Sequence, residues 1–248
     1  MAAELFDPLA APFRRDGTNG EAVVLTHGFT GTPAHFIPLA DHLHSDGFTV
    51  VAPLLAGHGT HLDDMASTDH NDWLDSVRVA ARSVADHNRV HLVGISMGGL
   101  LSIHLAPEVG PASLTTINSP VRFHAATAYL APVMHRFRPT VMWEEGPEPD
   151  LDLEMRPYWL TYPGFPTESF TELMRLAFTA PGIARTLGIP ALVIQSKTDE
   201  SVHPSSGEIL ARNLRCRLVW LEDSLHMALL DRERHVIHAE VVRRLRTA

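Results

Sequence analysis

The stretch Gly94-Ile95-Ser96-Met97-Gly98 constrains the fold of this chain more than any other feature, because of what stands on either side of it. The apolar run 90–93 is typical of a buried strand, and residues 99–106 have the composition of a helix. Glycines on both sides of a serine let the backbone turn sharply enough between strand and helix to expose the hydroxyl. The sequence therefore predicts a strand, a tight turn and a helix, with Ser96 as the candidate nucleophile.

Strand-like and helix-like segments alternate along most of the chain. Short apolar or β-branched runs predict buried parallel strands at residues 22–26, 48–51, 90–93, 114–117, 191–194 and 216–221. Helical spacing of apolar residues predicts helices over 33–44, 72–87, 99–106, 205–213 and 232–247. This alternation is typical of the α/β class, with a mostly parallel, doubly wound sheet. We expect one domain spanning residues 1–248.

Residues 120–181 interrupt this alternation. They contain ten of the seventeen aromatic residues of the chain, and the segment is too long for a simple crossover. Apolar spacing over 129–137 and 170–178 predicts two short amphipathic helices, which would form a small cap over the strand ends near the serine. Most of these aromatics would fill the core of the cap, and a minority would face a substrate. The candidate substrate-binding residues are Gly28, Tyr129, Trp143, Trp159 and Phe178.

A serine attacks a carbonyl only when a base takes its proton and a third group orients that base. Asp199 lies in the loop after the predicted strand 191–194, and His226 lies in the loop after the predicted strand 216–221. The carboxyl ends of parallel strands share one edge of the sheet. We therefore expect Ser96, Asp199 and His226 to meet there as a catalytic triad.

Other polar residues near these positions are alternatives. Glu200 adjoins Asp199, and Asp223 precedes His226 by three residues, so either could serve as the acid. His203 stands before Pro204 and is expected to be structural. The segment 57–64 and His27 look superficially like metal ligands, but a glycine-permitted loop beside the site is the preferred interpretation. We expect neither a metal nor a cofactor.

The oxyanion formed during attack needs hydrogen-bond donors that are already aimed at it. One predicted donor is the backbone N–H of Met97, because the first amides of a helix point outward without partners. The second is the backbone N–H of Phe29, in the loop 27–31 that follows the first core strand. Gly28 and Gly31 let this loop approach the site.

Composition excludes several classes of partner. The formal net charge is −9, which disfavours nucleic acid. Apolar residues make up 45% of the chain, but no run is long enough for an integral membrane segment. The first residues lack the basic and apolar parts of a signal peptide, so a cytoplasmic location is expected. An aromatic cap leaves an oligomer possible.

Several motifs together resemble the bacterial carboxylesterase and monoacylglycerol lipase family of α/β-hydrolases. These are His27-Gly28-Phe29-Thr30-Gly31-Thr32-Pro33, Gly57-His58-Gly59-Thr60, Gly94-Ile95-Ser96-Met97-Gly98-Gly99, Asp199-x-x-Val202-x-Pro204 and the loop of His226. The resemblance implies an α/β-hydrolase fold and a serine esterase without a cofactor, acting on short- to medium-chain acyl esters or monoacylglycerols. It also implies an acyl-enzyme intermediate formed by Ser96, with Asp199, His226 and the Phe29 and Met97 amides in the roles given above. The chain departs from this family in the cap, where residues 162–166 lack the acid expected to hold a glycerol.

Two other functions stay open at this point. The same triad and oxyanion donors would serve a thioesterase, a lactonase or a carbon–carbon bond hydrolase. A non-catalytic ligand receptor on a hydrolase scaffold is a third possibility. The intact triad argues against the receptor, but it does not distinguish ester hydrolysis from the other three reactions.

Overall fold

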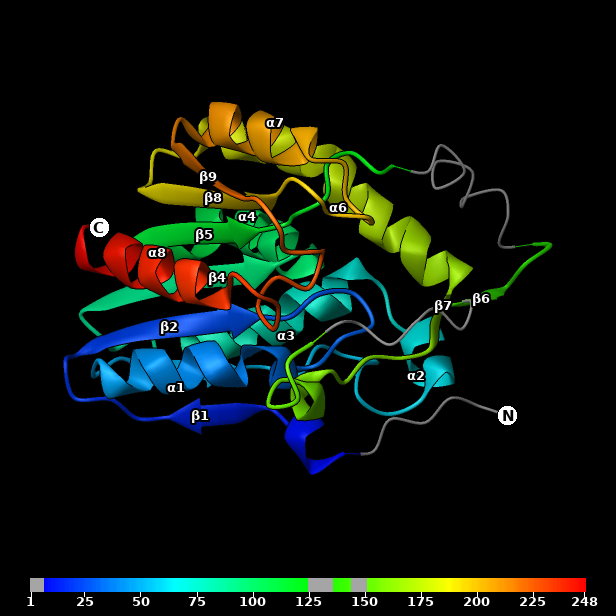
Figure 1. The fold of residues 1–248 in the computed structure, drawn as a ribbon, viewed down its shortest axis with the longest axis horizontal. Coiled ribbons are helices and arrows are strands. Elements are labelled where there is room, and N and C mark those ends of the chain that lie inside the picture. Colours follow the sequence, from blue (N-terminus) through cyan, green and yellow to red (C-terminus); the bar gives the residue numbers. More distant parts are fainter. Residues whose placement is uncertain (1–6, 125–135, 144–150) are drawn as a thin grey trace.

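A seven-stranded sheet forms the centre of the computed structural model, which describes residues 7–124, 136–143 and 151–248 (Figure 1). Its strand order is β1-β3-β2-β4-β5-β8-β9. The strands are β1 (Phe13–Arg15), β2 (Glu21–Thr26), β3 (Thr49–Ala52), β4 (Arg89–Ile95), β5 (Ser113–Ile117), β8 (Ala191–Ser196) and β9 (Arg217–Leu221). Every neighbouring pair is parallel except β1 and β3. The predicted mostly parallel sheet is confirmed, and the short antiparallel edge strand β1 is an addition to it.

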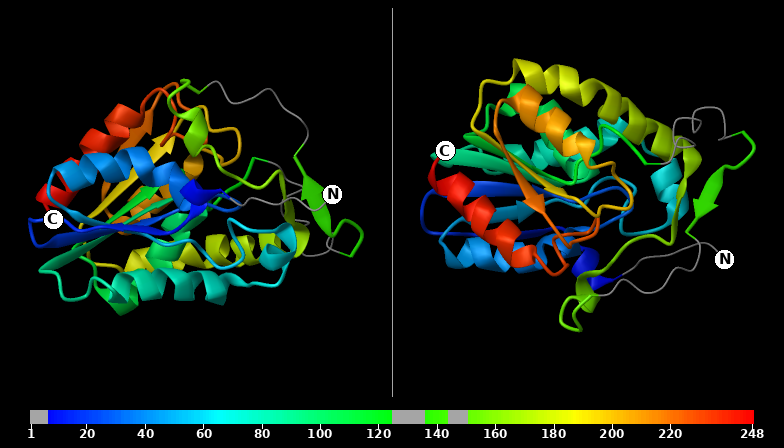
Figure 2. Two further views of the ribbon diagram at one scale, coloured as in Figure 1. Left: turned by 90° about the horizontal axis from the view of Figure 1, so that it is seen from below. Right: turned by 45° about the horizontal axis from the view of Figure 1, so that its top comes forward.

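Helices cover both faces of the sheet (Figure 2). One apolar layer joins α1 (Ile37–Ser45) and α8 (Arg234–Arg246) to the strands through residues such as Val23 and Leu25. The other layer packs against Ala22 and Val24 and involves α3 (His70–Arg82), α4 (Met97–Val109), α6 (Thr167–Thr186) and α7 (Ser205–Leu214). Alternate residues of one strand thus enter opposite cores, as a doubly wound arrangement requires.

Local sequence explains where the predicted helices begin and end. The helix expected over 72–87 runs from His70 to Arg82, and it begins at His70 because Asp69 and Asp72 form a reciprocal capping box there. The helix expected over 33–44 is divided into a 3₁₀ helix η2 (Pro33–Phe36) and α1, which has a proline in its first turn. Helix α4 ends at Gly110, whose left-handed conformation closes the last turn.

The insertion after β5 differs from the predicted pair of short helices. The second expected helix, over 170–178, is part of the 20-residue α6, which runs beyond residue 181. Its residues Leu176, Ala180 and Ala184 are buried in the core beside α4 and α7, so α6 also builds the body of the domain. Most of the first expected helix, residues 129–135, lies outside the described residues, and Arg136 and Phe137 form a turn.

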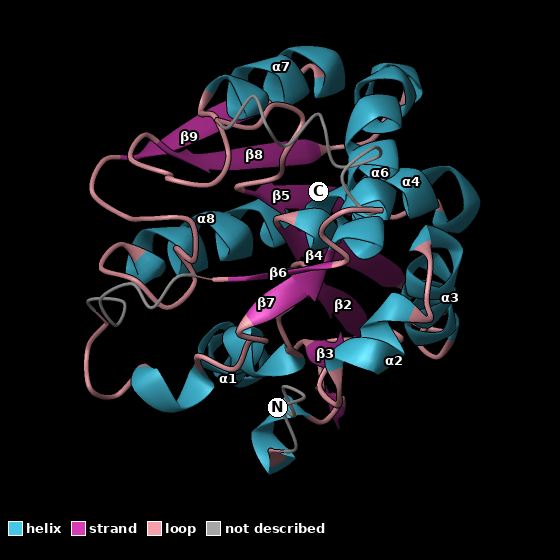
Figure 3. Cartoon of the chain, turned by 90° about the vertical axis from the view of Figure 1, so that its right-hand side faces the viewer, coloured by secondary structure: helices cyan, strands magenta, loops and turns pink. Residues whose placement is uncertain are grey.

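Short elements complete the insertion and its surroundings. Strands β6 (Thr140–Met142) and β7 (Gly164–Pro166) pair antiparallel, and Figure 3 shows them in front of the central sheet, with α2 beside β7. The remaining short helices are α2 (Leu62–Ala66), η1 (Pro8–Ala10) and η4 (Arg156–Tyr158). Their three to five residues are too few to produce a clear periodic pattern in the sequence.

The turn between β4 and α4 adopts the sharp geometry that its glycines predict. Ser96 has φ 53° and ψ −123°, a conformation that costs free energy for a residue with a side chain. A Cβ on Gly98 would lie 1.9 Å from the Thr26 carbonyl oxygen, and one on Gly94 would lie 2.3 Å from the Gly98 backbone. The close packing around Ser96 therefore requires glycine at both positions 94 and 98, because a side chain at either would clash with the backbone.

Replacing Gly98 with alanine is expected to destabilise the fold by about 3 kcal/mol or more, because backbone atoms of β2 would have to move. The matched control is Gly182→Ala in α6, where a Cβ would meet no atom within 4 Å. The control is expected to be neutral or to stabilise by up to about 1 kcal/mol. Urea unfolding midpoints measure both changes, and equal midpoints for the two variants would contradict the close packing of the turn.

Candidate active site

Three side chains that are far apart in the sequence form a chain of hydrogen bonds at the carboxyl edge of the sheet. The Ser96 Oγ lies 3.1 Å from the His226 Nε2. The His226 Nδ1 lies 2.9 Å from the Asp199 Oδ2. Ser96 follows β4, Asp199 follows β8 and His226 follows β9. The structure thus brings together the three residues predicted from their loops, at distances suited to proton transfer.

Asp199 is held as an acceptor by the loop that carries it. The residue as a whole is 3% exposed, and its Oδ1 accepts hydrogen bonds from the N–H groups of Ser201 at 2.9 Å and Val202 at 2.7 Å. An ionised carboxylate only accepts, so the Nδ1 of His226 donates to it. The lone pair on Nε2 is then left to accept the proton of Ser96.

The pKa of His226 reflects two opposing effects. Burial lowers it, but the charge and the hydrogen bond of Asp199 raise it, and the charge of Glu200 adds to this. The balance lies above the ordinary value of 6.5, because the imidazolium gains more from the carboxylates than it loses by leaving water.

The position of this pKa predicts the acid limb of the pH profile. His226 must be neutral to accept a proton, so turnover should fall with decreasing pH, with a midpoint above 6.5. A profile of kcat/KM against pH measures this midpoint in the free enzyme. A midpoint clearly below that of an ordinary histidine would contradict the described environment of His226.

Carboxylates that the sequence analysis did not select hold the loop of His226. Glu233 accepts hydrogen bonds from the N–H groups of Glu222, Asp223 and Ser224 and from the Ser224 hydroxyl. Asp231 accepts from the N–H of Leu225 at 2.7 Å. These acids precede or begin a helix in the sequence, where they resemble ordinary solvated residues, so no sequence signal distinguished them.

The alternative acids and base have other positions. Glu200 accepts a hydrogen bond from the backbone N–H of His226 at 3.0 Å, so it supports the loop instead of orienting the ring. Asp223 is exposed, and its backbone N–H donates to the Glu233 carboxylate. His203 accepts from the N–H of Ser205 at the start of α7, which is a structural contact.

Asn118 is a further residue at this edge that the sequence analysis missed. It follows β5 and has a positive φ of 45°, which asparagine tolerates better than most residues. Its side-chain amide donates to the His226 carbonyl at 2.8 Å, and its side-chain oxygen accepts from the Ser196 N–H at 2.7 Å. One side chain therefore ties the histidine loop to the end of β8.

The loop 27–31 contributes backbone amides beside the serine. The His27 Nε2 accepts from the Leu55 N–H at 3.1 Å, so the His27 Nδ1 carries the proton that it donates to the Gly28 carbonyl at 2.9 Å. Burial and the neighbouring His58 hold the pKa of His27 well below 6.5, so the ring stays neutral. The Gly28 carbonyl is thus engaged. The N–H groups of Phe29 and Met97 have no acceptor among the described residues.

The insertion locks this loop from the other side. The Tyr162 N–H donates to the Thr30 carbonyl at 3.0 Å, and the Thr32 hydroxyl donates to the Leu160 carbonyl at 3.2 Å. The buried Tyr162 hydroxyl accepts from the Thr60 N–H and donates to the Gly57 carbonyl. Residues 160–162 therefore connect the loop of the predicted oxyanion donor to the loop 57–61.

Aromatic rings gather around Phe29. Its ring centroid lies 5.7 Å from that of Phe165 and 6.0 Å from that of Phe170, both from the insertion. Trp143 packs on Phe165 at 4.9 Å. Phe165 and Phe170 were recognised as cap aromatics but not selected as site residues, because spacing alone does not separate a ring near the serine from a ring in the cap core.

The other predicted substrate-binding residues have varied positions. Gly28 lies against the serine, since a Cβ on it would be 3.1 Å from the Ser96 Cβ. The ring of Trp159 lies tilted beside the buried His35 of η2, with 6.2 Å between the ring centroids. Phe178 lies on α6 and is 68% exposed, and its role in substrate binding stays a prediction. Tyr129 lies outside the described residues.

The histidines of the 57–64 segment show no metal-binding arrangement in the described part of the chain. His58 is buried against His27, Trp73 and Tyr162, and burial lowers its pKa to about 4. No group of three His, Cys, Asp or Glu side chains in residues 7–124, 136–143 and 151–248 is placed to hold a metal ion.

Comparison with known proteins assigns this arrangement to a family. The alpha/beta hydrolase family matches residues 23–239, which include all three members of the hydrogen-bond chain. The chain belongs to the alpha/beta hydrolase family. Its sheet, its strand order and the placement of the serine after β4 are those of the α/β-hydrolase fold.

Similar members of the alpha/beta hydrolase family are lipases and esterases. The chain is 32% identical over 238 residues to a thermostable monoacylglycerol lipase of Bacillus sp. (strain H-257), covering 92% of this chain and 91% of that protein. It is 25% identical over 235 residues to a carboxylesterase of Bacillus subtilis (strain 168), covering 93% and 94%. A solved structure reported for the metagenome-derived lipolytic enzymes LipS and LipT superposes with a TM-score of 0.88 at 27% identity, covering 98% of this chain and 100% of the other.

These relatives support an ester hydrolase of the lipase and esterase type. Their likeness extends over nearly the whole chain, so it includes both the sheet and the insertion. Among the described residues, no helix is long and apolar enough to cross a membrane.

Proposed function

We propose that this protein is a serine carboxylic ester hydrolase that cleaves short- to medium-chain acyl esters or monoacylglycerols through an acyl-enzyme intermediate. The observation that carries the proposal is the continuous chain of hydrogen bonds from Ser96 through His226 to Asp199. A hydroxyl, an imidazole and a buried carboxylate in this order form the arrangement that activates a serine. The proposal needs no cofactor.

The proposed reaction has two steps that use the same groups. His226 takes the proton of Ser96 through Nε2 as the Oγ attacks the ester carbonyl, and the N–H groups of Phe29 and Met97 receive the oxyanion. The carbon–oxygen bond to the alcohol then breaks, and His226 gives its proton to the departing alcohol. In the second step, His226 activates water, which releases the acid and restores Ser96.

Two features support an acyl ester as the substrate. The rings of Phe29, Phe165 and Phe170 provide an apolar surface next to the proposed oxyanion donor. Similar proteins include a monoacylglycerol lipase and a carboxylesterase. The segment 162–166 contains no acid to hold a glycerol. The proposal therefore specifies the acyl group of the ester more closely than its alcohol.

A panel of p-nitrophenyl esters of increasing chain length, with matched monoacylglycerols and acyl thioesters, tests the proposal. We expect kcat/KM to rise by up to about fourfold for each methylene that the pocket accommodates and to fall beyond medium length. Ester turnover should exceed thioester turnover for the same acyl group. A preference for thioesters, or activity that rises steeply on long-chain triacylglycerol, would overturn the substrate class while leaving the triad in place.

A cytoplasmic location and an oligomer formed through the cap remain predictions from the sequence.

A further inference from the structure

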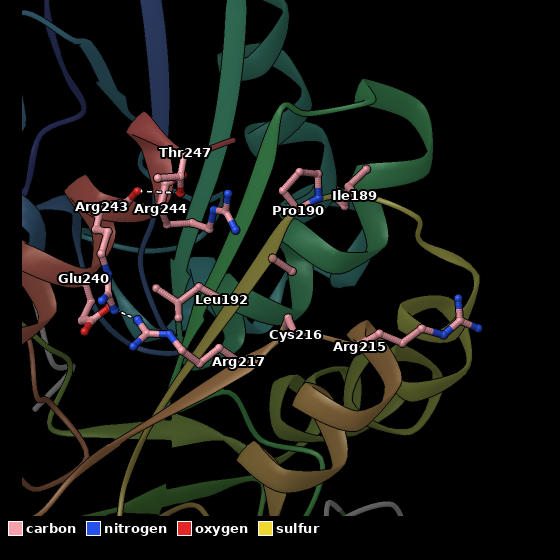
Figure 4. Close-up of a pocket in the computed structure, with 11 residues that line it drawn as sticks. Ile189, Pro190, Leu192, Arg215, Cys216, Arg217, Glu240, Arg243, Arg244 and Thr247 are labelled. Atoms are coloured by element: carbon pink, nitrogen blue, oxygen red, sulfur yellow. Dashed lines mark hydrogen bonds and ion pairs between the residues drawn. The ribbon is translucent and has the colours of Figure 1, made fainter.

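A cavity of about 420 Å³ lies away from the triad, where β8 and β9 begin and α8 ends (Figure 4). Its floor is residues 189–192 and Cys216, and its rim carries Arg217, Arg243 and Arg244. The loops that carry Asp199 and His226 follow the opposite ends of β8 and β9. Because β8 and β9 are parallel, this arginine pocket lies at the amino edge of the sheet and is separate from the candidate active site.

Positive charge exceeds negative charge in the arginine pocket. Glu240 is the acid among its lining residues, and it accepts contacts from both Arg217 and Arg243. One carboxylate between two guanidinium groups leaves a net positive charge before Arg244 is counted. The whole chain, by contrast, has a formal net charge of −9, so the pocket is a local positive region on an acidic protein.

Arg244 differs from its neighbours on α8. Basic residues in the last turn of a helix are ordinarily explained by the partial negative charge of that end. Arg243 fits this explanation and pairs with Glu240, and Arg246 pairs with Asp46 at 3.0 Å. Arg244 has no ion pair among the described residues, and its Nε is buried without an acceptor. Figure 4 shows its guanidinium extending across the pocket, whereas Arg215 points away.

The unpaired charge of Arg244 acts on the groups around it. It lowers the pKa of the Cys216 thiol, although burial is the larger effect and raises that pKa to about 11. Burial lowers the pKa of His91, and the charge of Arg244 lowers it further by a smaller amount. A partly buried guanidinium with a donor left unsatisfied is a site for an acceptor that the protein itself does not supply.

We propose that the arginine pocket binds a small anion through an oxyanion group, a carboxylate or a phosphate, that accepts hydrogen bonds from Arg244 and sits beside Arg217. The planar guanidinium matches both groups, because each presents two oxygens to it. Pro190 and Leu192 offer an apolar floor to the remainder of a small organic anion. The volume is within the range for small-molecule sites and too small for a macromolecule.

Cys216 provides the test, because it lines the pocket and is the single cysteine of the chain. The probes are inorganic phosphate and butyrate, each titrated at constant ionic strength against chloride. The readout is the rate of Cys216 alkylation by iodoacetamide, followed by intact mass. A bound anion should slow alkylation several-fold and saturably, because it covers the thiol and neutralises the arginine that favours the thiolate.

Two variants make the result specific. Arg244→Gln should raise the half-saturating anion concentration at least tenfold. For each variant, protection is measured as the alkylation rate with anion relative to the rate without anion in that same variant. Arg246→Gln, on the same helix but outside the pocket, should be protected like the wild type. Protection by phosphate alone or by butyrate alone supports the site and identifies its oxyanion. Absence of protection by both probes, or undiminished protection in Arg244→Gln, would overturn the proposal. Ester hydrolysis in both variants reports that they are folded.

Discussion

Replacing Ser96 with alanine is expected to reduce kcat by about 10⁴- to 10⁶-fold, because no other group in the proposed site can form the acyl-enzyme. The fold should be retained. The alanine removes only a hydroxyl that is in contact with His226 and keeps the Cβ, so the strain in the backbone of the turn should be unchanged. Turnover of the best ester of the panel and the urea unfolding midpoint measure the two effects separately.

The control for this variant is Ser201→Ala. Ser201 is an exposed serine in the loop of Asp199, and the loop uses its backbone N–H, which the substitution keeps. Its turnover should stay within about twofold of the wild type, since surface substitutions of this kind have small effects. If Ser96→Ala retained activity comparable with that of Ser201→Ala, Ser96 would not be the nucleophile.

Asp199→Asn is expected to reduce kcat by about 10⁴-fold. The asparagine amide can donate to the His226 Nδ1, which favours the tautomer with the proton on Nε2 and blocks proton transfer from Ser96. Loss of the carboxylate also removes the charge that raises the pKa of His226, so the acid limb of any residual activity should move to lower pH.

Glu200→Gln is the matched comparison, because the Glu200 carboxylate accepts a hydrogen bond from the backbone N–H of the same histidine, His226. A glutamine oxygen can still accept that hydrogen bond, so kcat should fall by less than about tenfold. The acid limb should also move to lower pH, since Glu200 contributes to the raised pKa of His226. A larger loss in Glu200→Gln than in Asp199→Asn would assign the orienting role to Glu200.

The sequence was sufficient for the main features of the site because chemistry and topology agree there. The glycines around Ser96 predict a sharp turn, the residues on either side predict a strand and a helix, and the structure has β4 and α4 in those places. The positions of Asp199 and His226 follow from a general property of parallel sheets, in which successive loops share an edge. No contact between side chains had to be known.

The supporting residues could not be predicted, because their function depends on contacts between distant segments. Asn118 joins the end of β5 to the loop of His226, and Glu233 accepts hydrogen bonds from amides nine to eleven residues before it. In the sequence, the first is an ordinary residue after a strand and the second is one acid among many. Only their partners in three dimensions distinguish them from solvated residues.

The insertion shows the same limit for secondary structure. The apolar spacing around 170–178 indicated a helix, but its length depends on packing against α4 and α7, which buries residues as far as Ala184. Helix α6 also contains Pro181 and continues past it to Thr186, although a proline removes one backbone hydrogen bond of a helix. The role of Tyr129 and the extent of the cap remain predictions.

Labelling with a fluorophosphonate, followed by intact mass and peptide mapping, tests the central claim most directly. The claim is that His226 activates Ser96 as the attacking nucleophile. It predicts one phosphonyl group per chain, located on Ser96, and a loss of ester hydrolysis in proportion to labelling. It also predicts no adduct in Ser96→Ala and much slower labelling in Asp199→Asn. An adduct on another residue that accounts for the lost activity, or full turnover by protein labelled at Ser96, would contradict it.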